Sequence, residues 1–268
     1  MVMLTNELVP RHDEGGITTL TLNAPNTINA LSETMMAALG SQLDRIVADD
    51  AVRVVVIRGA GAHFCAGHNL KEMAARRSDA DGGLGYFRAL FQTCSEVMLR
   101  ITQLPQPVIA EVSGIATAAG CQLVAACDLA VASNDARFAT SGVNIGLFCS
   151  TPLVALSRTV ARKHAMEMLL TGGFIDAQQA VGMGLVNRAV PGAELADATR
   201  QLAVDIASKT PAAIKVGKRL FYEQATLSME EAYAMAGEVM ACNMMADDTT
   251  AGIDAFINKR PMPEWCGK

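Results

Sequence analysis

The sequence predicts an α/β fold in which strands and helices alternate, followed by a region made of helices. Three observations predict it. The run Val52–Ile57 is rich in β-branched residues, which is typical of a strand buried on both faces of a parallel sheet. Strand-like and helix-like stretches alternate through the first 190 residues. From about residue 194 to residue 260 the pattern is helical throughout.

The first elements are two strands and a helix. We expect strands over Glu7–His12 and Ile17–Leu22, joined at the pair Gly15–Gly16. Ser32 can cap a helix whose apolar residues recur every three or four positions up to Val47. With the strand Val52–Ile57 next, a strand, helix, strand order emerges.

A long helix is expected over Leu84–Thr102, and it ends before Pro105. The apolar stretch Val108–Ala132 follows and is long enough to span a membrane. It carries Glu111, Asp128 and many small residues, so we interpret it as buried core without membrane insertion. Within it we expect, in order, a strand, a helix and a strand: Val108–Val112, Cys121–Cys127 and Leu129–Ala132.

Asp176 with Gln179 predicts a capping box for a short helix, and Leu185–Val190 is the last expected strand. Ser228 with Glu231 predicts a second capping box in the helical region. We therefore expect a core over residues 1–193 and a helical region over 194–268. Several methionines of that region occupy apolar positions and would pack on the core or on another subunit: Met229, Met235, Met240, Met244 and Met245.

Composition excludes several classes of function. Of the 268 residues, 51% are hydrophobic and 18% are charged, which excludes disorder over most of the length. The net charge of −5 and the scattered Lys and Arg argue against nucleic acid as a partner. Seven cysteines, an odd number without a CxxC pair, indicate reduced thiols rather than a disulfide framework or a metal site. With no targeting segment recognised at the N-terminus, we expect a cytoplasmic protein.

Two loops rich in glycine and alanine are the candidate site. They are residues 64–71 and 114–122; each follows an expected strand and leads toward a helix. Small residues let a ligand approach the backbone closely, and free N–H groups at a helix N-terminus face negative charge. Side by side, two such loops would form an oxyanion hole.

These loops and three further blocks resemble the crotonase (enoyl-CoA hydratase/isomerase) superfamily over essentially the whole chain. The blocks are Asn29–Ser32, Phe64–Met73, Pro107–Ala110, the loop at 114–122 with Cys127–Asp128, and Ala255–Phe256 with Lys259–Arg260. The resemblance implies a ClpP-like spiral of ββα units with a C-terminal helical region that builds trimers or dimers of trimers. It also implies a CoA thioester as ligand, coenzyme A as part of the substrate, no permanently bound cofactor and no metal.

The resemblance further implies roles for particular residues. The backbone N–H groups of His68 and Ala119 would hold the thioester oxygen. The remaining implied contacts are with coenzyme A: Asn26, Thr27 and Ile28 along its length, the Ala66 carbonyl and Leu70 at the adenine, and Phe256 and Lys259, from this or a neighbouring subunit, over the nucleotide. Asn26 stands where a Lys or Arg is common, which removes a phosphate partner.

The catalytic positions depart from the hydratase pattern. The two glutamates that add water in hydratases of this superfamily match Gln122 and Gly142, and an acidic position used by dienoyl-CoA isomerases matches Ser150. Neither Gln122 nor Gly142 can carry a proton, so ordinary hydratase activity is in doubt. The His68 imidazole is a candidate replacement. Acyl-chain selectivity is expected to depend partly on Tyr86 and Phe87.

Three functions fit this pattern, and whether the chain is an enzyme stays open. The first is a hydratase- or isomerase-like enzyme acting on an unusual acyl-CoA. The second is a decarboxylase of a malonyl-CoA-like thioester, in which loss of carbon dioxide generates the enolate directly. The third is a non-catalytic protein that binds acyl-CoA on an inherited fold.

Overall fold

The computed structural model describes residues 7–267, and within that range the strands form two sheets. The larger sheet has the order β1-β2-β3-β4-β6-β9, in which β1 is antiparallel to β2 and later neighbours are parallel. The smaller sheet has the order β5-β7-β8. The strands are β1 (Arg11–Glu14), β2 (Ile17–Leu22), β3 (Val54–Gly59), β4 (Val108–Val112), β5 (Ile115–Thr117), β6 (Leu129–Ser133), β7 (Arg137–Ala139), β8 (Ile175–Asp176) and β9 (Arg188–Val190).

The expected strands are observed, with some shifted ends. β2 and β4 have the expected bounds, whereas the strand expected from Glu7 begins at Arg11. Pro10 has no N–H to donate to a ladder, so before Arg11 the described segment only accepts hydrogen bonds, through the Pro10 carbonyl from Thr21 and the Leu8 carbonyl from Asn23. The strand expected from Leu185 begins at Arg188, because Leu185 is still hydrogen-bonded to the end of the preceding helix through Ala180.

Helices cover both faces of the larger sheet. They are α1 (Glu33–Val47), α2 (Leu70–Ala75), α3 (Leu84–Gln103), α4 (Ala119–Ala126), α5 (Ser150–Thr159), α6 (Arg162–Thr171), α7 (Ala177–Met183), α8 (Leu195–Ala207), α9 (Pro211–Gln224), α10 (Met229–Met244) and α11 (Asp247–Ile257). The Ser32 cap is confirmed, since its hydroxyl accepts the Met35 N–H at 3.1 Å. Both capping boxes, at Asp176 and at Ser228, are confirmed as well.

From β4 to β7, successive strands alternate between the two sheets. β4 lies in the larger sheet, β5 continues in the smaller one, and α4 follows; β6, β7 and α5 repeat this order. At the corner between β4 and β5, Gly114 has φ +54°, and a Cβ there would lie 2.2 Å from the carbonyl oxygen of Ala62. Only glycine fits this corner. The expected α/β spiral of ββα units is confirmed.

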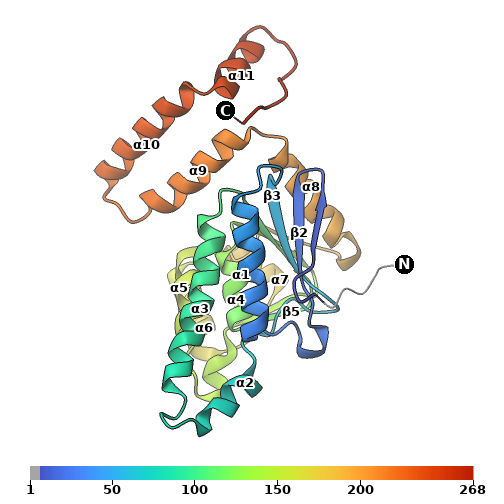
Figure 1. Cartoon of the computed structure of the whole chain (residues 1–268), viewed down its shortest axis with the longest axis vertical. Helices are drawn as coiled ribbons and strands as arrows, with labels where there is room; N and C mark the ends of the chain where they lie inside the picture. The colour runs from blue at the N-terminus through green and yellow to red at the C-terminus, as the bar shows by residue number, and fades with distance from the viewer. Residues whose placement is uncertain (1–6, 268) are drawn as a thin grey trace.

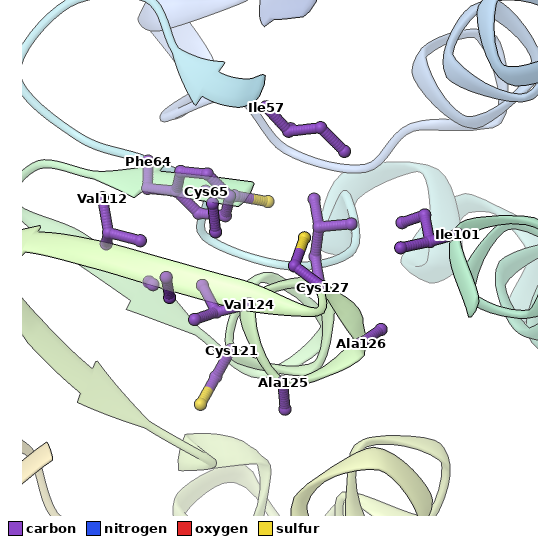
Figure 2. Packing of buried hydrophobic residues seen from close by; sticks show 14 of the residues in the cluster. Ile57, Phe64, Cys65, Ile101, Val112, Cys121, Val124, Ala125, Ala126 and Cys127 are labelled. Atoms are coloured by element: carbon purple, nitrogen blue, oxygen red, sulfur yellow. The ribbon is translucent and has the colours of Figure 1, made fainter. Parts of the chain in front are cut away.

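The β-branched run of β3 is buried on both faces, as expected. Val55 and Ile57 belong to the main core beneath α1, α3 and α4. Val54 and Val56 face the opposite way, into a second cluster with Leu195 of α8. α4 is buried along its whole length, and Figure 2 shows several of its apolar side chains packed in the main core. The apolar stretch that could have spanned a membrane is thus interior core, and no helix in residues 7–267 is long and apolar enough to cross one.

The last three helices project from one end of the core (Figure 1). We call α9–α11 the helical arm. Its methionines do not pack on the core of their own chain: Met229, Met240 and Met245 are 77%, 72% and 82% exposed. α8, in contrast, lies on the larger sheet. The division of the chain after residue 193 stays a prediction.

Candidate functional site

The two glycine- and alanine-rich loops lie side by side because isolated β-bridges extend the smaller sheet. Cys65 bridges Ala116, and the Thr117 N–H donates to the Cys65 carbonyl at 3.0 Å. One step further, Leu31 bridges His68, and the Leu31 N–H donates to the Gly67 carbonyl at 2.7 Å. Three segments distant in sequence therefore meet at this edge.

Glycines allow the two loops to approach closely. A Cβ on Gly67, whose φ is +87°, would lie 3.0 Å from the Ala119 nitrogen. A Cβ on Gly120 would lie 2.2 Å from the carbonyl oxygen of Cys65. Side chains at these positions would push the loops apart, so the glycines set the separation of the backbone groups between them.

The two amides expected to form an oxyanion hole lie at this contact. Ala119 is the first residue of α4, and the residue before it, Ala118, has φ +51° and ψ −119°, a strained conformation for a residue with a Cβ. Within residues 7–267, neither the His68 N–H nor the Ala119 N–H donates a recorded hydrogen bond. Two unpartnered donors, one at a helix N-terminus, are suited to an oxygen that carries negative charge.

These amides belong to residues at the wall of a cavity of about 650 Å³. Most of the sequence-predicted site residues line it: Asn26, Thr27, Ile28, Ala66, His68, Leu70, Ala119, Gly142 and Ser150. Among the lining residues of the described chain, Lys71 is the one Lys, Arg, Asp or Glu. No group of three or more His, Cys, Asp or Glu in that range could hold a metal ion.

Three predicted residues are not at the cavity. Phe256 and Lys259 lie on and after α11 of the helical arm, and Phe256 is 75% exposed. Within one chain the structure does not bring them to the site. Gln122 is buried, and its Oε1 lies 4.0 Å from the Cys94 thiol of α3. Its side-chain oxygen therefore faces the packing between α3 and α4.

Gly142 and Ser150 line the cavity without offering a proton carrier. A Cβ on residue 142 would lie 2.3 Å from the Leu147 carbonyl oxygen and 2.8 Å from the Cys149 sulfur. The backbone here leaves no space for a side chain at residue 142. Ser150 begins α5 exposed, and its hydroxyl donates weakly to the Phe148 carbonyl at 3.4 Å. Burial raises the pKa of the Cys149 thiol, so it is not a ready thiolate.

The His68 side chain is held beside the cavity. Its Nδ1 lies 3.4 Å from the Leu31 carbonyl oxygen, and its ring meets the Phe91 ring edge-on with centroids 5.6 Å apart. Its Nε2 is buried without a hydrogen-bond partner in the described chain. Burial lowers the pKa of His68, against smaller raising effects of the Leu31 backbone and Glu72.

Sequence reasoning missed several lining residues. Tyr86 and Phe87 were expected to shape the acyl pocket, but neither lines the cavity. Arg76 lies over the Tyr86 ring and Arg77 over the Phe87 ring instead. Phe91, one turn further along α3, lines the cavity. Helical spacing could have suggested it, but only the approach of α3 to α4 decides which turn reaches the site.

The fold and this site define a class of protein. Residues 12–268 match the family model described as enoyl-CoA hydratase/isomerase, and the chain belongs to this family, the crotonase superfamily. The resemblance seen in the sequence is thereby confirmed.

More particular relatives follow from comparison with known proteins. The sequence resembles enoyl-CoA hydratase domain-containing protein 3 through Phe91–Ser95, Ala116–Leu123 and Gly146–Pro152, and comparison confirms this. The chain is 45% identical to the human mitochondrial protein of that name over 250 residues, 93% of this chain and 80% of the relative. It is 30% identical to 1,2-epoxyphenylacetyl-CoA isomerase of Escherichia coli K12, over 98% of this chain and 99% of that protein.

Solved structures of members of this family have the same fold as this chain. A crystal structure of enoyl-CoA hydratase from Mycobacterium smegmatis superposes with TM-score 0.91 at 54% identity and covers 96% of this chain and 98% of its own. The crystal structure of human enoyl-CoA hydratase domain-containing protein 3 gives TM-score 0.91 at 43% identity, covering 96% and 100%.

Proposed function

We propose that this protein binds an acyl-CoA thioester and stabilises the enolate form of its acyl group in an oxyanion hole. The proposal is carried by the unpartnered amides of His68 and Ala119, which belong to two interlocked loops at one wall of the cavity. Donors fixed in place before the reaction interact most strongly with an oxygen that gains charge, and one such donor typically contributes roughly 100- to 1,000-fold in rate.

The same cavity accommodates the coenzyme part of the ligand in this proposal. Asn26, Thr27 and Ile28 form a 3-10 turn and its end at one side, where the neutral Asn26 offers no charge to a phosphate. Lys71 supplies a positive charge among the lining residues near Leu70. Phe256 and Lys259 would have to come from a neighbouring copy to close over the nucleotide.

Hydration is expected to be slow. Each positioned acid or base contributes about 100- to 10,000-fold, and Gln122 and Gly142 supply neither. The test is hydration of crotonyl-CoA at high enzyme concentration, beside a hydratase that keeps both glutamates, together with calorimetric binding of butyryl-CoA. Binding with a background rate supports the proposal. Absence of binding would contradict it, and a rate equal to that of the control would contradict the loss of ordinary hydratase chemistry.

A decarboxylase of a malonyl-CoA-like thioester is the second candidate. Besides the amides, the lining is largely apolar and includes Phe91, Leu147, Phe148 and Pro152 but no carboxylate. Such a site disfavours a bound carboxylate, which leaves as carbon dioxide while the electron pair of the broken C–C bond enters the enolate; water then supplies the proton to C2. Release of carbon dioxide from malonyl-CoA tests it. Tight binding with no turnover in either assay would point to the third candidate, a non-catalytic acyl-CoA-binding protein.

We also propose a homotrimer or a dimer of trimers built through the helical arm, since a monomer would leave Met240, Met245 and Phe221 in water. Analytical ultracentrifugation tests this. Met240→Glu should reduce the mass toward that of a monomer, whereas Val47→Glu, at an exposed apolar residue on α1, should not. A wild-type monomer at micromolar concentration would refute the proposal.

We propose a reducing compartment, with the cytoplasm as our expectation, because the seven cysteines are unpaired and five of them are buried. The rat and human relatives named enoyl-CoA hydratase domain-containing protein 3 carry the word mitochondrial in their names. Cell fractionation of the native protein separates the two locations.

A further inference from the structure

Two hydroxyl groups meet where two strands of the smaller sheet end beside the cavity. Thr117 is the last residue of β5, and Ser141 follows two residues after the end of β7. β5 and β7 pair in parallel with Thr117 opposite Ala139, so both segments leave the sheet at the same edge. The two hydroxyl oxygens lie 2.8 Å apart and share a hydrogen bond.

Ser141 is the member of this pair that belongs to the cavity. It lines the cavity and is only partly buried, whereas Thr117 is not among the lining residues. The Thr117 hydroxyl therefore contacts Ser141 from behind the lining. Neither hydroxyl makes a second hydrogen bond within residues 7–267, so Thr117 is the side chain that orients the Ser141 hydroxyl.

The pair can both donate and accept a further hydrogen bond. Two hydroxyls carry two protons and four lone pairs, and the bond between them uses one of each. If Thr117 donates, the Ser141 proton is free, and if Ser141 donates, its oxygen still offers a lone pair. A group with both capacities is suited to a water molecule, which also donates and accepts.

The other hydroxyls of the lining lack such a partner. Those of Thr27 and Ser150 donate to backbone carbonyls at 3.0 Å and 3.4 Å. Thr151 lines the cavity as well, but no hydrogen bond in the described chain orients its hydroxyl. Ser141 is thus the lining hydroxyl that a second hydroxyl holds in place.

Ser141 is also close to the place where the proposed function puts the thioester. Thr117 precedes Ala119 by two residues, so covalent geometry keeps their Cα atoms at most about 7.6 Å apart. The Ala119 N–H would hold the thioester oxygen, and C2 of the acyl group is bonded to the carbonyl carbon that carries this oxygen. The hydroxyl pair and C2 therefore belong to the same part of the cavity.

We propose that Ser141, oriented by Thr117, holds the water molecule that exchanges a proton with C2 of the acyl group. The inference rests on the proposed function, because the amides of His68 and Ala119 must stabilise the enolate. As the enolate reacts, its electron pair forms a C–H bond at C2 with a proton of this water, and the remaining hydroxide ion leaves to solvent. In the reverse direction, hydroxide takes the proton from C2 and becomes water, while the electron pair of the C–H bond enters the enolate.

Exchange of the C2 hydrogens of butyryl-CoA for deuterium tests this step without hydration or decarboxylation. The full-length protein is mixed with butyryl-CoA in deuterium oxide, and proton NMR follows the loss of the C2 signal, while calorimetry measures the dissociation constant. Three variants remove the hydroxyls: Ser141→Ala, Thr117→Val and the double variant. Thr117→Ser keeps the hydroxyl and serves as the conservative replacement.

Two control variants remove hydroxyls of other kinds. Thr34→Val removes one member of an exposed hydroxyl pair on α1, in which Ser32 and Thr34 lie 3.0 Å apart. Thr151→Val removes a hydroxyl of the lining that no side chain orients. Melting temperatures establish that all variants are folded.

Wild-type protein should exchange the C2 hydrogens faster than they exchange in butyryl-CoA alone. Ser141→Ala should lower the protein-dependent rate by about tenfold or more with little change in the dissociation constant, because positioned proton transfer typically contributes about 100-fold or more. Thr117→Val should lower it by a smaller factor, and Thr117→Ser should restore it. The double variant should be no slower than Ser141→Ala, since Thr117 acts only through Ser141. Both controls should keep the wild-type rate.

Each contrary result has a distinct meaning. If wild-type protein does not bind butyryl-CoA, or binds it without faster exchange, the proposed enolate stabilisation fails and this inference falls with it. If Ser141→Ala exchanges as fast as wild type, the proposed function stands and the role of Ser141 is refuted. If Ser141→Ala weakens binding as much as it slows exchange, Ser141 only shapes the cavity and the inference is wrong. Additive losses in the double variant would refute the orienting role of Thr117.

Discussion

Lys218 on α9 and Asp128, between α4 and β6, form an ion pair with 2.6 Å between Nζ and Oδ2, although both side chains are largely shielded from water. The Asp128 carboxylate also accepts the Val108 N–H at 2.7 Å and the Tyr222 hydroxyl at 2.8 Å. Lys218 in turn donates to the carbonyls of Ile101 and Gln106. The carboxylate thus joins the first residue of β4 to the helical arm.

Replacement of Lys218 by methionine should destabilise the protein strongly. It leaves the Asp128 charge buried without its cation, and removal of one partner of a buried pair costs about 3–5 kcal/mol. Urea unfolding measures the free energy. Arg219→Met is the control, because Arg219 is exposed and pairs only loosely with Glu223 at 3.9 Å; it should change stability by less than about 0.5 kcal/mol. Equal effects of the two substitutions would contradict the role given to Asp128.

Gly67→Ala should weaken acyl-CoA binding. The new Cβ would lie 3.0 Å from the Ala119 nitrogen at a residue with positive φ, so the two amides must separate. We expect the dissociation constant for butyryl-CoA to rise at least tenfold, which corresponds to a loss of about 1.4 kcal/mol of binding free energy. Gly82→Ala has the same backbone problem, with φ +67°, but no atom within 4 Å of its Cβ. It should lower stability yet leave binding unchanged, and unchanged binding in Gly67→Ala would argue against the oxyanion hole.

Gly142→Glu should not create a hydratase. Its Cβ would lie 2.3 Å from the Leu147 carbonyl oxygen, so the segment carrying Cys149 must move. Overpacking of this kind typically costs about 1–3 kcal/mol, and we expect a lower melting temperature without faster crotonyl-CoA hydration. Gly182→Glu, on α7 with open space around its Cβ, is the control and should melt near the wild-type temperature. A stable Gly142→Glu variant that hydrates crotonyl-CoA would contradict this account.

Asp248 makes stability depend on acid pH. Burial alone would raise its pKa, but hydrogen bonds from Thr210, Cys266 and Gly267 outweigh it and lower the pKa to about 2. A carboxyl group whose pKa is lowered by folding stabilises the folded state at pH values above its unfolded pKa, which is near 3.8 here. This contribution is lost as the pH falls toward 2. Two pKa units correspond to about 2–3 kcal/mol.

Asp248→Asn should therefore be less stable than wild type by about 2 kcal/mol at pH 7, with the difference shrinking between pH 4 and pH 2. Urea unfolding across this range measures it. Asp247→Asn, at the exposed neighbouring residue, should show no such convergence. If the difference in unfolding free energy between Asp248→Asn and wild type stayed constant with pH, the ionised carboxylate would not be what stabilises the contacts of residue 248.

Much of the fold could be predicted because its signals are local. β4 has the expected bounds because Pro107 precedes it and Gly114 forces the corner soon after. The capping boxes depend only on residues three positions apart. The true start of β1 at Arg11 depends on which N–H groups can pair with β2, and the helical pattern of the arm says nothing about what covers it.

The site was predictable only in part. The pairing of His68 with Ala119 came from family resemblance, since no spacing rule joins residues about fifty positions apart; the bridges at Leu31 and Cys65 create it. Gln122 could be placed on α4, but the position of Cys94 on α3 decides where its amide faces. The same holds for Gly142, whose lack of space arises from a loop that folds back from five residues further along.

That loop also bears on how this lineage can change. A codon for Asp or Glu at position 142 would place a side chain where the Leu147 carbonyl oxygen already lies. A second substitution that moves this loop would be needed as well before the carboxylate could be of use. The effect of a substitution at position 142 thus depends on the residues of the loop. Single substitutions elsewhere in the cavity are therefore an easier route to new chemistry on this scaffold than a carboxylate at position 142.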